Sequence, residues 1–171
     1  MIRTKVLNLD TKTSLWFLQF YKYHTINIGM RIISRSGDYG MIWLVFISLV
    51  TLFPHGQRIA QRMLFALLLA TILGQVVLKY WFSRKRPCQK NPTIDLLIVR
   101  PSDSSFPSGH TTSSFACATV ICYYSFVLGF FAVLFASIMA ISRLYLYVHY
   151  LSDVVFGILL GVLIGICIMM F

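Results

Sequence analysis

The sequence contains no glutamate, and all five of its acidic residues are aspartates. Only 12% of its 171 residues are charged, whereas charged residues make up about a quarter of an ordinary soluble domain. A soluble domain so poor in charge would have little with which to cover its surface. Because 58% of the residues are hydrophobic, the composition argues against a soluble core and indicates a membrane protein.

The sequence also lacks the pattern of a disulfide framework. Cys117, Cys122 and Cys167 lie inside apolar runs, where we expect them to pack as small apolar side chains, and Cys88 lies in a loop. There is no Cys-x-x-Cys pair, and no cysteine has the spacing from histidine that zinc sites use. Internal repeats and low-complexity segments are absent as well.

Long apolar runs cover residues 41–53, 63–82, 111–142 and 154–171. One membrane span needs about 20 residues, so the run at 111–142 predicts two helices joined by a tight turn near residues 125–129. The run at 41–53 is short for a span and ends at Pro54. We therefore predict an all-α integral membrane bundle of about five transmembrane helices.

Residues 1–35 differ from this core, which we assign to residues 36–171. Lys12 and Lys22 leave only nine residues between them, too few to cross a bilayer. Aromatic residues mix with cations here, which is typical of a helix lying in the membrane interface: Trp16, Phe17, Phe20 and Tyr21. A signal peptide is the alternative, but no small-residue cleavage site follows the apolar patch.

The formal net charge is +10, and the distribution of the cations indicates their partner. If the spans alternate, Arg58 and Arg62 lie on one side of the membrane and the other thirteen basic residues lie on the opposite side. A basic patch can bind nucleic acid. These cations flank membrane spans, however, so we expect anionic lipid headgroups and no nucleic acid.

Three glycines follow one another at intervals of four in the last apolar run: Gly157, Gly161 and Gly165. Small residues at this spacing share one helix face and let another helix approach closely. They predict tight packing, either inside the bundle or between the subunits of a homo-oligomer.

Three polar clusters interrupt the apolar sequence, and the first contains Lys79, Arg86 and Pro87. Lys79 and Arg86 are seven residues apart, which is close to two helical turns, so a continuous helix would place both on one face. Cations and aromatics at the end of a span are also common membrane anchors. Taken alone, this cluster fits an anchor better than a site, and we expect Arg84 and Lys85 to be anchors or headgroup contacts.

The second cluster is Pro107, Ser108, Gly109 and His110, directly before an apolar run. Proline, serine and glycine in this order favour a turn that opens a helix. The free N–H groups of a helix start can bind an anion, Ser108 adds a hydroxyl donor, and Gly109 allows close approach to the backbone. A plain helix cap with a bystander histidine explains the same four residues equally well.

The third cluster contains Arg143, His149 and Asp153. His149 and Asp153 are four residues apart and would be neighbours on a helix, where a carboxylate can fix the imidazole tautomer. Arg143 can bind phosphate oxygens with two parallel hydrogen bonds. An ion pair without catalytic function is the alternative. Ionisable residues at membrane depth are costly, however, and this favours a functional role.

The three clusters together resemble one family, the type 2 phosphatidic acid phosphatases, which are relatives of the vanadium-dependent haloperoxidases. Its signature is Lys-x6-Arg-Pro, then Pro-Ser-Gly-His, then Ser-Arg-x5-His-x3-Asp, and this chain carries every position, the last part beginning at Ser142. The resemblance implies that His149 is the nucleophile, Asp153 orients it and His110 is the general acid and base. It implies phosphate binding by Lys79, Arg86, Ser108, Gly109 and Arg143, with no metal and no cofactor.

The resemblance leaves the substrate open. We expect a lipid phosphatase acting on phosphatidic acid or phosphatidylglycerophosphate, with undecaprenyl diphosphate and lipid A phosphates as alternatives and residues 88–106 selecting the headgroup. A bundle that only binds or transports lipid phosphates is the alternative outside enzymes. The family implies an active site on the extracytoplasmic face of the inner membrane, whereas the excess of cations on that side favours the cytoplasm.

Overall fold

Most of the chain is helical, and residues 91–108 form a long connection without a helix. The computed structural model describes residues 2–171, with side chains from Thr4 onward. The elements are α1 (Ile2–Leu18), η1 (Gln19–Lys22), α2 (His24–Ser36), η2 (Asp38–Gly40), α3 (Met41–Val50), α4 (Gly56–Thr71), η3 (Ile72–Val77), α5 (Leu78–Phe82), α6 (Pro87–Lys90), α7 (Gly109–Tyr124), α8 (Phe126–Tyr145) and α9 (Leu151–Met170).

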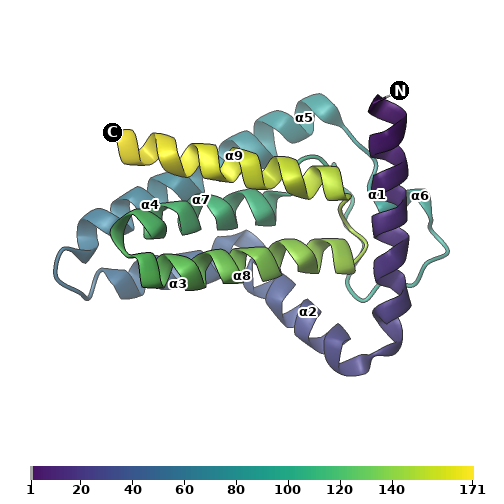
Figure 1. Ribbon diagram of the computed structural model, residues 1–171, viewed down its shortest axis with the longest axis horizontal. Coiled ribbons are helices and arrows are strands. Elements are labelled where there is room, and N and C mark those ends of the chain that lie inside the picture. The colour runs from purple at the N-terminus through teal and green to yellow at the C-terminus, as the bar shows by residue number, and fades with distance from the viewer. Residues whose placement is uncertain (1) are drawn as a thin grey trace.

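Helix α7 forms the centre of the bundle, with α4, α8 and α9 packed around it (Figure 1). Its residues are mainly small, and those from Gly109 to Ala118 are buried apart from His110, which is partly exposed. A helix that is buried on all sides needs no polar face. The small side chains of α7 therefore allow three neighbours to pack closely against it.

The predicted division of residues 111–142 into two helices is confirmed. Helix α7 ends at Tyr124 and α8 begins at Phe126, so the turn is a single residue. Ser125 has an extended backbone (φ −154°, ψ 120°), and its hydroxyl accepts a hydrogen bond from the backbone N–H of Leu128 at 3.3 Å. Serine is a favoured N-cap because it satisfies one of the free N–H groups at a helix start.

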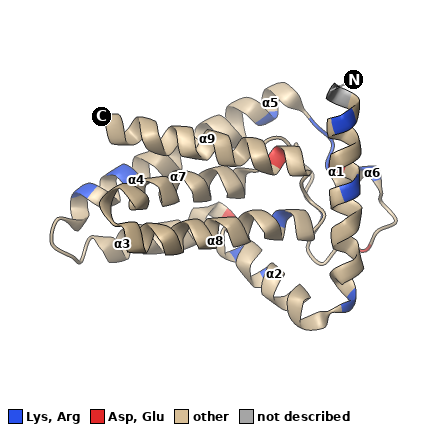
Figure 2. Ribbon diagram, viewed as in Figure 1, with Lys and Arg blue, Asp and Glu red and all other residues tan. Residues whose placement is uncertain are grey.

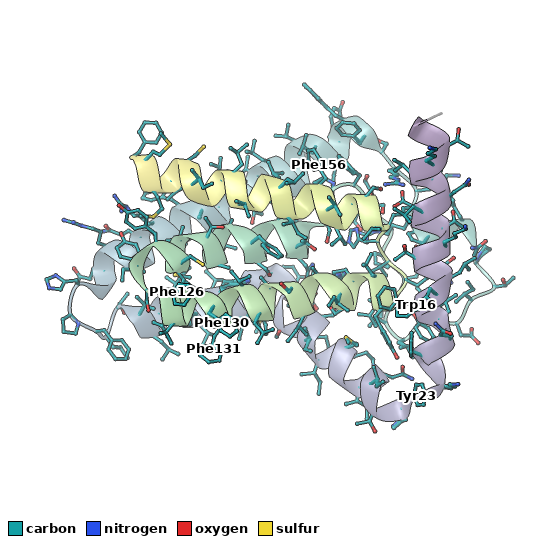
Figure 3. All side chains as sticks on the ribbon, viewed as in Figure 1. Trp16, Tyr23, Phe126, Phe130, Phe131 and Phe156 are labelled. Atoms are coloured by element: carbon teal, nitrogen blue, oxygen red, sulfur yellow. The ribbon has the colours of Figure 1, made fainter. Side chains whose placement is uncertain are left out.

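Three helical stretches among residues 2–171 are long and apolar enough to cross a membrane, namely Gly56–Lys90, Phe126–Tyr145 and Leu151–Met170. Twenty residues of α-helix extend about 30 Å, the thickness of the hydrocarbon layer. Phe126, Phe130 and Phe131 point outward from α8, as expected for side chains that contact lipid (Figure 3). The prediction of an all-α membrane bundle is confirmed.

The helix in the apolar run at residues 41–53 begins at Met41, as the run does, and ends three residues before the end of the run. Helix α3 has only ten residues, Met41–Val50, which extend about 15 Å. Tyr39 and Gly40, directly before it, have left-handed backbone conformations (φ 55° and 72°), and the helix cannot extend backwards through them. Helix α3 therefore packs against α4 without spanning the bilayer by itself.

The three glycines of α9 pack against α7 within the same chain. A Cβ atom at Gly161 would lie 2.5 Å from the backbone oxygen of Thr112, and one at Gly165 would lie 2.5 Å from Cβ of Thr119. Gly157 is buried in the same contact. Because α7 covers this face, the first of the two alternatives, tight packing inside the bundle, is confirmed for these glycines, and a homo-oligomer stays a prediction.

Helix α1 crosses one end of the bundle at a steep angle, and α2 runs obliquely back towards it (Figure 1). Most of the coloured cationic positions lie at this end, whereas two on α4 lie near the opposite end (Figure 2). This arrangement agrees with a segment lying at the membrane surface. The assignment of residues 1–35 to the interface stays a prediction.

Candidate active site

A cavity of about 400 Å³ opens at the end of the bundle that α1 crosses. Six of the eight residues predicted from the sequence line this cavity: Lys79, Arg86, Gly109, His110, Arg143 and His149. They come from five separate segments of the chain. The structure therefore brings together groups that are up to 70 positions apart (79 to 149) in the sequence.

Each side chain reaches the cavity from the end of an element. Lys79 lies in α5, directly after the π-helical segment η3, and Arg86 precedes α6. His110 lies in the first turn of α7 and Arg143 in the last turn of α8. π-helical turns often occur at functional sites because the inserted residue re-aims the side chains that follow.

The imidazole of His149 is held from both sides. Its Nδ1 lies 2.7 Å from the backbone oxygen of Ser105, which can only accept a hydrogen bond. Nδ1 therefore carries the proton, and the lone pair lies on Nε2, 3.0 Å from Nη1 of Arg86. Burial, reinforced by the positive charge of Arg86, holds the pKa of His149 well below its usual value. His149 is thus neutral near pH 7, as a nucleophile must be.

Asp153 does not form the predicted hydrogen bond with His149. Its Oδ2 lies 3.7 Å from Nδ1, which is beyond hydrogen-bonding distance. The backbone oxygen of Ser105 accepts the hydrogen bond of Nδ1 in place of Asp153. Asp153 instead accepts hydrogen bonds from the Ser105 hydroxyl and, at 2.8 Å, from the backbone N–H of Tyr150. It thus supports the loop that carries His149.

Arg84 is not the surface anchor that the sequence suggested. Its Nη1 lies 2.5 Å from Oδ1 of Asp153, and its Nη2 lies 2.7 Å from Oδ2 of Asp10 on α1. Asp10 also accepts hydrogen bonds from the backbone N–H and hydroxyl of Ser152, at 2.8 and 2.7 Å. Helix α1 is therefore joined to the start of α9, directly behind His149.

Asp103 neutralises two of the cations in the cavity. Its Oδ2 lies 2.5 Å from Nζ of Lys79, and its Oδ1 lies 2.9 Å from Nη2 of Arg86. Partial burial disfavours the charged form of Asp103, but the hydrogen bond from Lys79 and the charge of Arg86 outweigh it and lower its pKa to about 2. Asp103 is therefore an anion near neutral pH.

A second carboxylate contacts the other imidazole. Oδ1 of Asp38 lies 2.9 Å from Nε2 of His110. This hydrogen bond is the main reason that the pKa of Asp38 is lowered. Sequence reasoning missed Asp38 and Asp10. The small number of acidic residues in the sequence could have pointed to them. Four of the five lie in or beside this site: Asp10, Asp38, Asp103 and Asp153.

Ser108 and Arg143, both predicted to bind phosphate, differ in their position relative to the cavity. Ser108 is buried behind the cavity, and its hydroxyl is hydrogen-bonded to that of Thr111 at 2.8 Å. Arg143 lines the cavity, and one of its Nη atoms donates to the Ser34 hydroxyl. Its Nε has no hydrogen-bond partner among the described residues. An anion in the cavity is the natural acceptor for such a group.

Comparison with known proteins agrees with this geometry. Residues 59–171 match the PAP2 superfamily. This chain belongs to the PAP2 superfamily. The matched part contains every residue of the three polar clusters and leaves out α1, α2 and α3.

Several relatives of this PAP2 protein are phosphatases. An undecaprenyl-diphosphatase of Sulfolobus acidocaldarius is 30% identical over 150 residues, covering 84% of this chain and 69% of the relative. A decaprenylphosphoryl-5-phosphoribose phosphatase of Mycolicibacterium smegmatis is 33% identical over 129 residues, covering 75% and 69%.

The fold is shared with a solved relative. The crystal structure of the transmembrane PAP2 type phosphatidylglycerolphosphate phosphatase of Bacillus subtilis matches with a TM-score of 0.80 and 26% identity, covering 96% of this chain and 85% of the other. The protein is therefore a multi-pass membrane phosphatase that acts on lipid phosphates or diphosphates.

Proposed function

We propose that this phosphatase removes the terminal phosphate of phosphatidic acid or phosphatidylglycerophosphate through a phosphohistidine on His149. The observation that carries this proposal is the tautomer of His149. The Ser105 carbonyl holds the proton on Nδ1, so the lone pair of Nε2 lies at the wall of a cavity lined by three cations. A neutral imidazole facing a cationic cavity is suited to attack a phosphate.

In the first step, Nε2 of His149 forms a bond to phosphorus while the bond from phosphorus to the lipid oxygen breaks. The electron pair of that bond stays on the lipid oxygen, which takes a proton from His110 and leaves as an alcohol. Lys79, Arg86 and Arg143 stabilise the charge on the three other phosphate oxygens. Arg86 moves its hydrogen bond from Nε2 to the phosphate in this step.

In the second step, the now neutral His110 takes a proton from water as the water oxygen attacks phosphorus. The phosphorus–nitrogen bond breaks and its electron pair returns to Nε2, releasing inorganic phosphate. Splitting the hydrolysis into two displacements lowers each barrier. Asp38, beside His110, stabilises the imidazolium that both steps require.

The proposed reaction needs no metal ion, because the cations come from side chains. The test is phosphate release from dioleoyl phosphatidic acid in detergent micelles with EDTA present. We expect wild-type turnover, and a loss of at least about a thousandfold in His149→Ala. Retained lipid binding by this variant would separate catalysis from binding. Equal rates in wild type and variant would reject the enzyme mechanism and favour a binding bundle.

A polyprenyl diphosphate is the second candidate substrate. It is favoured by the undecaprenyl-diphosphatase relative, which aligns with 84% of this chain. The same two steps would release a prenyl phosphate in place of an alcohol. Comparing kcat/KM for dioleoyl phosphatidic acid, phosphatidylglycerophosphate and undecaprenyl diphosphate under one set of conditions decides between these candidates.

We also propose that the cavity opens on the extracytoplasmic face of the cytoplasmic membrane. Cys88 is fully buried and cannot report this by labelling. Val99 is 92% exposed, in the loop between α6 and α7. In a background with Cys122 and Cys167 replaced by serine, Val99→Cys should react with an impermeant thiol reagent in intact cells. His55→Cys, between α3 and α4 at the far end of the bundle, should not. The opposite pattern places the cavity in the cytoplasm.

A further inference from the structure

A second, smaller cavity adjoins the catalytic one on the side of His110. Its volume is about 180 Å³, and its walls come from Leu67 and Thr71 of α4 and from the turn at residues 37–40. Tyr39, Gln75 and His110 line both cavities. The two spaces are therefore contiguous, with His110 at their boundary.

The two imidazoles relate differently to this second cavity. His149 lines the catalytic cavity alone, whereas His110 lines both. In a phosphoryl transfer, the attacking and leaving atoms lie on opposite sides of phosphorus, roughly in line. The leaving oxygen also has to meet the group that protonates it. With His149 as the nucleophile and His110 as the acid, the leaving group points towards the second cavity.

The side of the consecutive helical segments α4, η3 and α5 that faces the two cavities changes from apolar to cationic along the chain. Leu67, Thr71, Gln75 and Lys79 follow one another at intervals of four residues, and neighbours at this spacing lie on the same side of a helix. Leu67 lines the second cavity at the apolar end of this series, and Lys79 lines the catalytic cavity at the cationic end. A lipid phosphate has the same order, with its chains at membrane depth and its phosphate at the boundary.

Several residues that line the second cavity are exposed at the protein surface. Thr71 and Gln75 are exposed, and Tyr39 is 94% exposed on the other rim. Leu68 and Ile72, next to Thr71 on the outer surface of α4 and η3, are exposed apolar residues that suit contact with lipid chains. The left-handed backbone of Tyr39 (φ 55°) is strained for a side chain of this size, and such strain gathers at functional sites.

The charge of the second cavity restricts what it can hold. Of the described residues that line it, none is a lysine, an arginine or an aspartate. An uncharged alcohol can enter such a site, whereas a phosphate group left there would meet no cation other than His110, which has to give up its proton in the first step.

We propose that this cavity is a leaving-group site for the uncharged alcohol of a lipid phosphate monoester, and that it selects monoesters over diphosphates. The reason is that a diphosphate would release an anionic lipid monophosphate into this cavity, whereas a monoester releases an uncharged alcohol. This inference rests on the proposed function and narrows its substrate to the phosphatidic acid class.

A larger cavity on the other side of Lys79 does not serve this purpose. It measures about 760 Å³ and is lined by Ser83, Arg84 and Lys85 among others, but neither His110 nor His149 lines it. A leaving oxygen placed there would be away from its proton donor. The contact with His110 therefore decides in favour of the smaller cavity.

The first test fills the cavity and leaves the phosphate site intact. Thr71→Phe places a ring at the rim, and Leu68→Phe places the same ring on the neighbouring lipid-facing surface as a matched control. For Thr71→Phe we expect kcat/KM to fall about tenfold or more with dioleoyl phosphatidic acid and to stay unchanged with acetyl phosphate. Leu68→Phe should behave as wild type with both. Equal losses on both substrates, or no loss on the lipid, would overturn the proposal.

The second test changes the charge of the cavity. Thr71→Arg supplies the missing cation, and we expect the ratio of kcat/KM for undecaprenyl diphosphate to that for phosphatidic acid to rise about tenfold. An unchanged ratio would contradict selection by charge. A wild-type protein that turns over neither lipid would instead refute the proposed function, so the two failures are distinguishable.

Discussion

Nη1 of Arg84 lies 2.5 Å from Oδ1 of Asp153, and the other Nη of the same guanidinium reaches Asp10 on α1. Asp153 is completely buried, and breaking a buried ion pair leaves an uncompensated charge in the interior. Arg84 therefore supports the loop of His149 from behind, and α1 takes part in that support although it lies outside the matched PAP2 region.

Replacing Arg84 by lysine tests this support. Lysine keeps the charge but cannot bridge two carboxylates with a planar guanidinium. We expect kcat to fall about 10- to 100-fold with little change in KM, because a small displacement of His149 is costly whereas the phosphate-binding residues remain. Steady-state kinetics measure both constants.

Lys85→Met provides the control for Arg84→Lys, since Lys85 is the exposed neighbour. It should retain wild-type kcat. A rise in KM in Arg84→Lys without a change in kcat would show that Arg84 binds substrate directly.

Replacing Asp38 by asparagine removes the anion beside His110. Since the pKa of Asp38 is lowered, its carboxylate is charged throughout the range in which activity is measured. We expect activity to depend on pH as a bell, with neutral His149 and protonated His110 required together. In Asp38→Asn the imidazolium loses its counter-charge, so the alkaline limb should move about one unit to lower pH.

The acid limb should stay in place in Asp38→Asn, because it reports the protonation of His149. The pKa of His149 is lowered by burial, so this limb should lie well below pH 6.5 in both proteins. Asp95→Asn, at an exposed loop position, is the control and should leave the profile unchanged. A parallel shift of both limbs would contradict the assignment.

Replacing Asp103 by asparagine frees Lys79 and Arg86 for phosphate. In the free protein the Asp103 carboxylate forms ion pairs with both Lys79 and Arg86. A phosphate that binds to these cations therefore has to displace the carboxylate. Asp103 is 49% exposed, and exposed ion pairs contribute little. We therefore expect the inhibition constant of inorganic phosphate to fall only about twofold to fivefold. A weaker inhibition by phosphate would show that Asp103 organises the cations.

Substituting Gly161 by alanine should destabilise the bundle by about 1–3 kcal/mol, because the new methyl group would meet the α7 backbone at Thr112 and Ala116. The thermal unfolding midpoint in detergent measures this change. Gly29→Ala is a matched control, since nothing lies within 4 Å of its Cβ position. Equal midpoints for the two variants would mean that α7 and α9 are not held this closely.

Much of the fold was predictable because the signals are local. The apolar run at 111–142 is too long for one span, and Ser125 is a good N-cap, so a break at that position follows from length and capping alone. The length of α3 was not predictable in this way. The run at 41–53 is apolar to its end, but the helix stops at Val50 and the chain turns over residues 51–55, which hydropathy does not reveal.

The candidate site divides along the same line. The residues that line the cavity belong to motifs of fixed spacing, and six of them were predicted from those motifs. The groups that hold the two imidazoles and Arg84 were not predicted: Ser105 is 44 residues from His149, Asp38 is 72 from His110, and Asp10 is 74 from Arg84. Contacts over such separations leave no periodic pattern in a sequence.

The amino-acid sequence by itself determined the membrane class and the helix content, because apolar length carries these properties, and its three motifs led to six of the residues that line the cavity. Only the tertiary structure decided that Ser105, and not Asp153, fixes the His149 tautomer, and that the α9 glycines pack on α7. It also decided which imidazole borders the cavity beside α4. Hydrogen bonds and close packing depend on where distant segments meet, and that is set by the whole bundle at once.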